Sequence, residues 1–153
     1  PLKMAAKVDP VDHEYFQAVV KPLLEDGRVD FIGEITDEGK NAFLGQALAL
    51  VCPFRPESFG LVLVESLACG TPVLAYRHGS FPEIIDHGIT GFLCRTAEEM
   101  AESVSLLPRL DRRRCRAAFE ARFTASRMVF AYLEVYDELI LARRAQRDRT
   151  ALH

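Results

Sequence analysis

The stretch from Pro56 to Pro72, PESFGLVLVESLACGTP, decides how this chain folds. Its centre is apolar or small from Phe59 to Cys69, and the Gly-x-Pro sequence after it is typical of a helix end. Ser58 is a candidate N-cap, so we expect a helix from Phe59 to Cys69 that is buried nearly all round. Glu65 places a carboxylate in this helix, and burying a carboxylate without a partner costs several kcal/mol. We therefore expect a partner group that compensates the buried charge of Glu65.

The segments around this helix alternate between strand and helix patterns. Strands are expected at Leu2–Val8, Val29–Ile32, Ala49–Cys52, Val73–Tyr76 and Phe92–Cys94. Helices are expected at Asp9–Leu24, Thr36–Leu48, Phe59–Cys69, Ser80–Asp86, Thr96–Leu107, Leu110–Arg122 and Ser126–Arg144. Two of these helices begin with capping-box spacing, Ser80 with Glu83 and Thr96 with Glu99. The alternation predicts an α/β fold with a Rossmann-like parallel sheet of five strands, flanked by helices, and extra C-terminal helices.

The amino-acid composition limits the classes of protein to which this chain can belong. The 153 residues are 49% hydrophobic and 27% charged, which suits one globular domain. Residues 1–100 hold 8 basic and 15 acidic side chains, an acidic balance that argues against nucleic acid as a partner. The basic side chains gather between Arg109 and Arg127, a run that we interpret as a solvated helix face rather than a membrane or phosphate site.

The sequence lacks the patterns typical of membrane, secreted and metal-binding proteins. No apolar run reaches the roughly 18 residues of a membrane span, and no signal peptide pattern is present, so we expect a cytoplasmic protein. The chain begins at Pro1 without a Met, so we expect a piece of a longer polypeptide. Its four cysteines lack C-x-x-C spacing, its histidines have no ligand spacing, and no D-x-D motif occurs. We expect no metal and no cofactor.

The fold predicts where a ligand would bind. Ligands of open parallel sheets bind beyond the carboxyl ends of the strands, and Glu57 and the start of its helix follow such an end. We expect the backbone N–H groups of Phe59, Gly60 and Leu61 to point into this crevice and to favour a phosphate. Glu65 lies roughly 8 Å further along the helix at 1.5 Å per residue. Carboxylates on both sides of a phosphate site suit a nucleotide-sugar, with a ribose diol, a diphosphate and a hexose.

Structural roles are the alternative for these acidic residues. Glu65 could pair with an arginine elsewhere or reach solvent at a helix edge. Glu57 could be a cap or a surface charge. The residue pattern leaves both alternatives open.

The same stretch resembles the C-terminal domain of family 4 glycosyltransferases, which are retaining enzymes of the two-domain GT-B fold. The resemblance extends from Leu2 to about Arg144, and Glu57 and Glu65 have the spacing of that family's E-x7-E motif. The segments that carry it are Pro56–Leu61, Glu65, Ala68–Val73, Gly79–Ile85 and Gly88–Leu93.

The resemblance implies an organisation and a set of site residues. Residues 1–144 would be a Rossmann-like nucleotide-sugar-binding domain that lacks its first strand-helix unit and the N-terminal acceptor domain, and 145–153 a frayed tail. Glu57 would be the catalytic candidate and bind the donor sugar, and Glu65 would bind the ribose. The other donor-binding candidates are Phe59, Gly60 and Leu61 at the sugar and diphosphate, Gly33, Glu34 and Ile35 along the base, and His78, Gly79 and Ser80 near the phosphates. Lys7 is a candidate to substitute for the family's phosphate-binding Arg and Lys, which this chain lacks, and a surface residue is the alternative.

The function implied is that of the donor-binding half of a retaining glycosyltransferase. The full-length enzyme would move a hexose from a nucleotide-diphosphate sugar, such as a UDP- or GDP-sugar, to an acceptor hydroxyl. The acceptor, a sugar or a lipid, would bind the N-terminal domain, and we expect this chain alone to be inactive. The alternatives are a non-catalytic nucleotide- or sugar-binding module and a GT-B epimerase or phosphorylase.

The last predicted helix has an apolar face that the other domain would cover in GT-B proteins. Phe130, Leu133, Tyr136 and Leu139 belong to this face. A dimer of the truncated form through these side chains is therefore expected as an artefact.

Overall fold

The computed structural model describes residues 1–53 and 59–150, and within α8 it leaves out the side chains of 145 and 148–150. The chain divides into two compact units, Pro1–Phe43 and Leu44–His153, and each is described by itself.

The first unit is built on two parallel strands. β1 (Leu2–Ala5) pairs with β2 (Val29–Gly33) from Leu2 opposite Val29 to Ala5 opposite Gly33. The residues between the strands are helical, with a π-helical turn in the middle: η1 (Pro10–Asp12), α1 (His13–Tyr15), η2 (Phe16–Val20) and α2 (Lys21–Leu24). The Phe16 ring of this segment packs on Phe31 of β2 at 5.2 Å between centroids. The parallel pairing therefore follows the predicted strand-helix-strand order.

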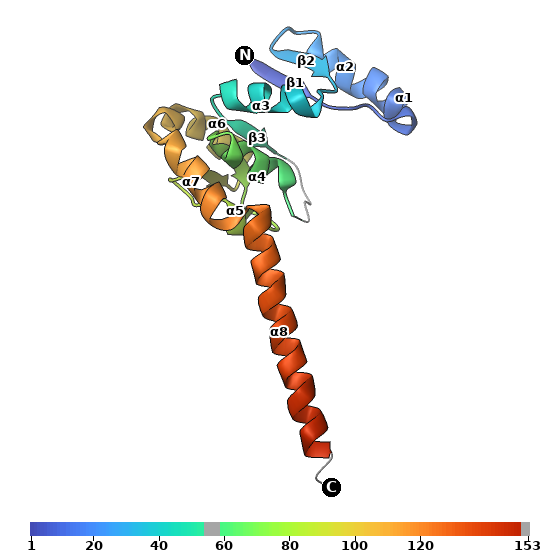
Figure 1. The fold of residues 1–153 in the computed structure, drawn as a ribbon. Helices are drawn as coiled ribbons and strands as arrows, with labels where there is room; N and C mark the ends of the chain where they lie inside the picture. The colour runs from blue at the N-terminus through green and yellow to red at the C-terminus, as the bar shows by residue number, and fades with distance from the viewer. Residues whose placement is uncertain (54–58, 151–153) are drawn as a thin grey trace. The chain divides into compact units, whose positions relative to one another are not determined.

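The second unit holds the other three strands. β3 (Leu50–Cys52), β4 (Val73–Tyr76) and β5 (Gly91–Cys94) are parallel in the order β3-β4-β5. The helices of this part of the chain are α4 (Leu61–Ala68), α5 (Phe81–Ile84), α6 (Ala97–Ser103), η3 (Val104–Arg109) and α7 (Arg112–Arg122) (Figure 1). α3 (Asp37–Gln46) precedes β3, and the Thr36 hydroxyl accepts a hydrogen bond from Gly39 N at its start. The α/β class is confirmed, and the described residues form five parallel strands in two sheets rather than one.

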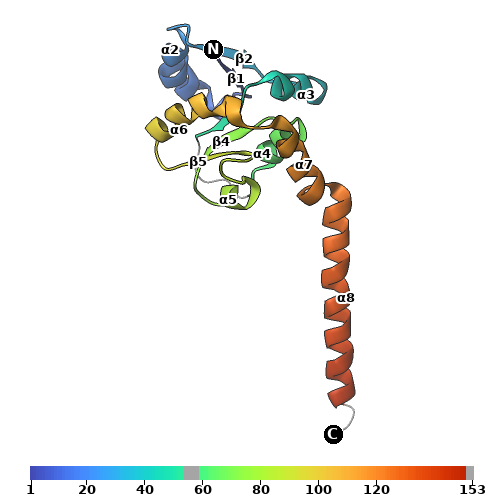
Figure 2. The ribbon, with the colours of Figure 1, turned by 90° about the vertical axis from the view of Figure 1, so that its left-hand side faces the viewer.

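Both faces of the second sheet are covered. Val73 and Ala75 of β4 pack in one hydrophobic cluster with Leu63 and Leu67 of α4. Leu74, between them in sequence, packs in a second cluster with residues of β5, α6 and η3. Figure 2 shows α4 and α7 on one side of β4 and β5, and α6 on the other. The alternation of side chains along β4 explains why this strand is apolar at every position.

Two predicted helix boundaries are confirmed, and the predicted start of α4 is wrong. Gly70, at φ +68°, ends α4, and the Thr96 hydroxyl accepts a hydrogen bond from Glu99 N at the start of α6. α4 begins at Leu61 with Gly60 as its N-cap, not at Phe59, and the predicted cap Ser58 lies outside the described residues. Leu61 is 67% exposed, so α4 is not buried all round as predicted. Its first turn is accessible to a ligand.

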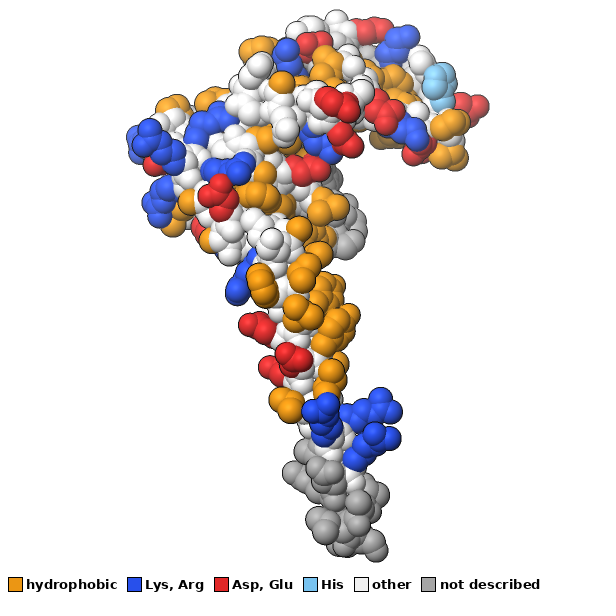
Figure 3. Space-filling view, in the orientation of Figure 1, with side chains coloured by type: hydrophobic (Ala, Val, Ile, Leu, Met, Phe, Trp, Pro, Cys, Tyr) orange, Lys and Arg blue, Asp and Glu red, His pale blue; other side chains and the backbone are white. Residues whose placement is uncertain are grey.

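The chain ends in one long helix. α8 (Ala125–Thr150) continues past Arg144, so most of the tail that we expected to be frayed is helical. Figure 3 shows hydrophobic side chains along one side of α8 and acidic ones on another. The predicted apolar face is exposed here, at 63% for Phe130 and 51% for Leu133. No described helix combines the length and the apolar character that crossing a membrane requires.

Candidate functional site

The candidate site lies where β3 and β4 end. Cys52 pairs with Ala75, so these parallel strands reach their carboxyl ends at the same edge of the sheet. The segment after β3 leads to α4, and the segment after β4 leads to α5. The predicted catalytic residue Glu57 falls in this first segment, outside the described residues. Its role stays a prediction.

Gly60 shapes the start of α4. It has φ +89° and ψ +49°, in the left-handed region that L side chains rarely adopt. Its carbonyl accepts hydrogen bonds from Leu63 N at 3.0 Å and Val64 N at 3.3 Å. The amides of Leu61 and Val62 come before these and have no carbonyl in a preceding turn of the helix to bind. Their partial positive charge favours an anion at this end of α4.

The loop after β4 is joined to this helix start. Ser80 Oγ donates to the Phe59 carbonyl oxygen at 2.7 Å, although 21 residues separate the two in sequence. His78 and Gly79 lie in the same loop, and Gly79 has φ +54°. The structure therefore brings the predicted residues of the β4–α5 loop against the predicted residues before α4.

The same hydrogen bond corrects the capping-box prediction for Ser80. α5 has Ser80 as its N-cap residue, but the Ser80 side chain makes no cap hydrogen bond. Sequence reasoning found the spacing to Glu83 and missed the distant carbonyl of Phe59. No local signal identifies Phe59, because the contact is formed only when β3 and β4 lie side by side.

Glu65 lies on α4 one turn beyond Leu61, the first residue of the helix. It is half-buried, whereas its neighbours Val64 and Ser66 are buried. The burial cost that drew attention to it is therefore smaller than for full burial.

The remaining predicted site residues belong to the first unit. Gly33 ends β2 with φ +73°, and its carbonyl accepts a hydrogen bond from Ala6 N at 3.0 Å. Glu34 and Ile35 follow it directly, and Lys7 lies beyond the end of β1. Lys7 Nζ pairs with an Asp9 carboxylate oxygen at 3.1 Å, and both side chains are largely exposed. These residues gather at the carboxyl edge of their own sheet.

The cysteines are packed in or at the edge of the core. Cys52, Cys94 and Cys115 are buried and Cys69 is partly buried, all four as free thiols. Burial raises the pKa of the Cys94 and Cys115 thiols. Among the described residues, no group of His, Cys, Asp and Glu is arranged to hold a metal ion.

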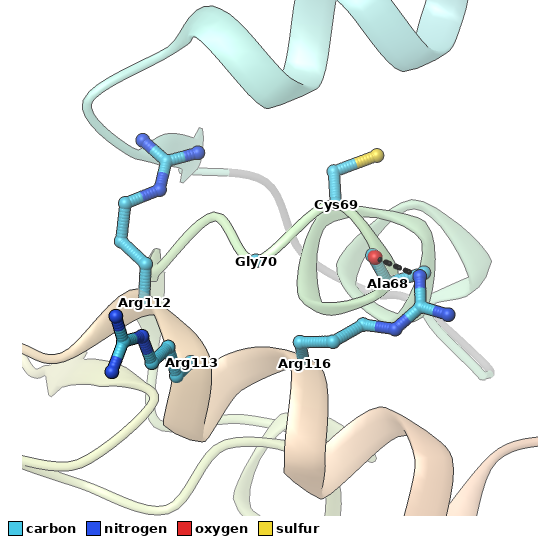
Figure 4. Close-up of a pocket in the computed structure, with 6 residues that line it drawn as sticks. All are labelled: Ala68, Cys69, Gly70, Arg112, Arg113 and Arg116. Carbon is cyan, nitrogen blue, oxygen red and sulfur yellow. Dashed lines mark hydrogen bonds between the residues drawn. The ribbon is translucent and has the colours of Figure 1, made fainter.

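A basic depression lies at the other end of α4. It is lined by Ala68, Cys69, Gly70, Arg112, Arg113 and Arg116 (Figure 4). The Arg112 guanidinium donates to the carbonyls of Ala47 and Gly45, both at 2.7 Å, and to Thr71 Oγ1 at 2.6 Å. Arg116 donates to the Ala68 carbonyl at 2.7 Å, as the dashed line in Figure 4 shows.

Arg112 is the exception to the predicted solvated basic face. It is half-buried, whereas Arg109, Arg113, Arg114, Arg116, Arg122 and Arg127 are exposed as predicted. Arg112 and Arg116 also donate to carbonyl groups near the ends of α3 and α4, where a cation is favourable. The depression is therefore explained by structural arginines.

Comparison with known proteins gives one family. The model of the family described as "Glycosyl transferases group 1" matches residues 11–122. N-acetyl-alpha-D-glucosaminyl L-malate synthase of Bacillus anthracis is 32% identical over 130 residues, which are 80% of this chain and 34% of that protein.

Solved structures show the same fold. The sucrose-phosphate synthase of Thermosynechococcus elongatus superposes with a TM-score of 0.77 at 25% identity, over 92% of this chain and 39% of that one. The Anabaena protein HepE in complex with UDP and glucose superposes with a TM-score of 0.75 at 22% identity, over 89% of this chain and 40% of that one. The chain thus spans about a third of the curated relative and two fifths of the solved ones.

Proposed function

This chain belongs to the group 1 glycosyl transferases, and we propose that it is the part of such an enzyme that binds the nucleotide-diphosphate sugar donor. The observation that carries the proposal is the joined pair of segments at the carboxyl edge of β3 and β4. There the start of α4, where the helix dipole is positive, is joined to the β4–α5 loop by the hydrogen bond from Ser80 to Phe59. A second support is that HepE, with the same fold, has been solved with UDP-glucose.

In this proposal the donor lies across the start of α4. Its diphosphate accepts hydrogen bonds from the amides at Phe59, Gly60 and Leu61, and the helix dipole stabilises the negative charge there. Glu65 accepts hydrogen bonds from the two ribose hydroxyls, which suits a carboxylate with two oxygens. Glu57 binds hydroxyls of the donor sugar.

His78 and Gly79, in the β4–α5 loop, line the phosphate side of the donor. The roles predicted for Gly33, Glu34, Ile35 and Lys7, which belong to the first unit, stay predictions.

The full-length enzyme would be a retaining hexosyltransferase. The backbone amides at the start of α4 would stabilise the negative charge that develops on the diphosphate as its bond to the sugar breaks. An acceptor sugar or lipid would bind the other part of the enzyme. Because this chain spans about a third of the curated relative, we assign it donor binding and expect little transfer from the chain alone.

Isothermal titration with UDP-glucose tests this proposal, with GDP-glucose and ADP-glucose as competitors for the choice of base. Glu65→Gln removes the charge of the carboxylate with little change in shape. We expect the Kd to rise by about tenfold or more, since hydrogen bonds to a charged group contribute about 1.5–3 kcal/mol.

Glu102→Gln is the matched control, because Glu102 is an exposed glutamate of α6. It should bind UDP-glucose as the wild type does. Equal Kd values for Glu65→Gln and the wild type would remove the ribose role. A wild-type chain that binds none of the three donors would remove the donor-binding function.

A further inference from the structure

The Ser80 hydroxyl is already engaged within the candidate site. Its Oγ donates to the Phe59 carbonyl oxygen at 2.7 Å. A serine hydroxyl has one proton to donate, and the oxygens of an ionised diphosphate only accept hydrogen bonds. While the proton is given to Phe59, Ser80 has none for a phosphate. The observed bond therefore supports a role other than the direct phosphate contact expected from the resemblance.

We infer that Ser80 is a positioning residue, whose hydroxyl holds the backbone at Phe59 and Gly60 so that the first turn of α4 is aimed at the donor. This inference rests on the proposed function. The Phe59 carbonyl immediately precedes Gly60, and Gly60 in turn accepts the first helical hydrogen bonds of α4. Fixing that carbonyl fixes the peptide plane before the cap, and with it the direction of the amides that follow.

An apolar wall supports the same backbone from a second side. A Cβ at Gly60 would lie 3.3 Å from Ile84 Cδ1 and 3.4 Å from Phe81 Cε1. Phe81 and Ile84 are both buried and belong to α5, which begins immediately after Ser80. The hydrogen bond at Phe59 and the packing at Gly60 thus come from one short segment, residues 80–84.

That segment is itself anchored to α7. Arg122, the last residue of α7, donates through one nitrogen to the Glu83 carbonyl of α5. Its other terminal nitrogen lies 3.2 Å from each carboxylate oxygen of Asp86. Ser80 is therefore attached to an element with its own fixed position, which lets one hydroxyl restrict the start of α4.

Three single variants of this chain test the inference. Ser80→Ala removes the hydroxyl, and Ser80→Thr keeps it. Ser105→Ala is the matched control, because the Ser105 hydroxyl also donates to a backbone carbonyl, that of Glu102 at 2.8 Å. The readouts are amide hydrogen exchange at Leu63 and Val64, whose N–H groups bind the Gly60 carbonyl, and the Kd for UDP-glucose by titration.

We expect Ser80→Ala to exchange faster at Leu63 and Val64 without ligand, and to raise the Kd by about three- to tenfold, the worth of one hydrogen bond. Ser80→Thr should restore both values to within about twofold, and Ser105→Ala should change neither. Wild-type exchange and Kd in Ser80→Ala would overturn the inference, and so would a failure of Ser80→Thr to restore them.

The two readouts separate this inference from the proposed function. A wild-type chain that binds none of UDP-glucose, GDP-glucose and ADP-glucose removes donor binding. Exchange in the free chain then decides alone whether the Ser80 hydroxyl restrains the first turn of α4: faster exchange in Ser80→Ala supports the restraint, and unchanged exchange overturns it.

Discussion

Replacing Gly60 by alanine tests whether the left-handed start of α4 is needed for donor binding. Gly60 has φ +89°, and an L residue in the left-handed region costs about 1–2 kcal/mol. The added Cβ would also press on the side-chain ends of Ile84 and Phe81, at 3.3 Å and 3.4 Å. Gly60→Ala should therefore lose about 1–3 kcal/mol of unfolding free energy if the backbone stays in place.

A second consequence follows if the backbone relaxes to relieve this strain. A shift at Gly60 moves the amides of the first turn of α4 away from the proposed diphosphate position. A displacement that sacrifices one or two hydrogen bonds raises the Kd for UDP-glucose by about 5- to 30-fold, which corresponds to about 1–2 kcal/mol. Urea unfolding measures the first effect and isothermal titration the second.

Gly88→Ala separates strain from binding. Gly88 has φ +77° in the same unit, and a Cβ there would meet no atom within 4 Å. Gly88→Ala should lose a similar part of the unfolding free energy from backbone strain and keep the wild-type Kd. Wild-type unfolding free energy together with wild-type donor affinity in Gly60→Ala, or an equal loss of affinity in Gly88→Ala, would refute the reasoning.

Three further predictions concern the frame around the site. Arg112→Ala leaves three oxygen acceptors without their donor, so we expect urea unfolding to show a loss of about 2–4 kcal/mol of unfolding free energy. The control Arg113→Ala, at an exposed position, should keep nearly the wild-type unfolding free energy. The Arg95 backbone N–H that donates to Glu99 lowers the pKa of that carboxylate below its usual 4.5. Its stabilising contribution is present above pH 4.5 and is lost as pH falls through the lower folded value. The difference in thermal midpoint between the wild type and Glu99→Gln should thus shrink from about pH 6 to about pH 3, and a constant difference would contradict this assignment. Burial raises the pKa of the Cys115 thiol. Iodoacetamide at about pH 8 should therefore leave Cys115 unmodified in the native chain and alkylate it after unfolding, as measured by mass spectrometry. Rapid alkylation of the native chain would show that the thiol is accessible and contradict this prediction.

Local patterns were sufficient to predict most of the fold. The apolar run Val73–Tyr76 is a strand with the predicted bounds, because a strand covered on both faces is apolar at every position. Gly70 and Thr96 act as helix end and helix cap, since left-handed backbone and a short hydroxyl side chain satisfy the groups at helix ends locally. The start of α4 was predicted two residues early, because the pattern of apolar residues continues through the left-handed turn at Gly60.

The candidate site was predicted only in part. The sequence placed the residues before α4 and those after β4 at strand ends, and parallel pairing of β3 and β4 brings them to one edge. The role of Ser80 was assigned wrongly to a local cap, and the role of Arg112 to a solvated face. Both side chains donate to a backbone carbonyl that is distant in sequence.

The sequence by itself determined which segments are strands and helices, where most of them end, and which candidate residues follow the carboxyl ends of the strands. Only the tertiary structure decided the partners of Ser80 and Arg112, which lie 21 and 65 residues away. The physical reason is that burial periodicity and turn geometry are properties of neighbouring residues. A hydroxyl or a guanidinium, in contrast, binds whichever carbonyl the packed elements bring within 3 Å of it.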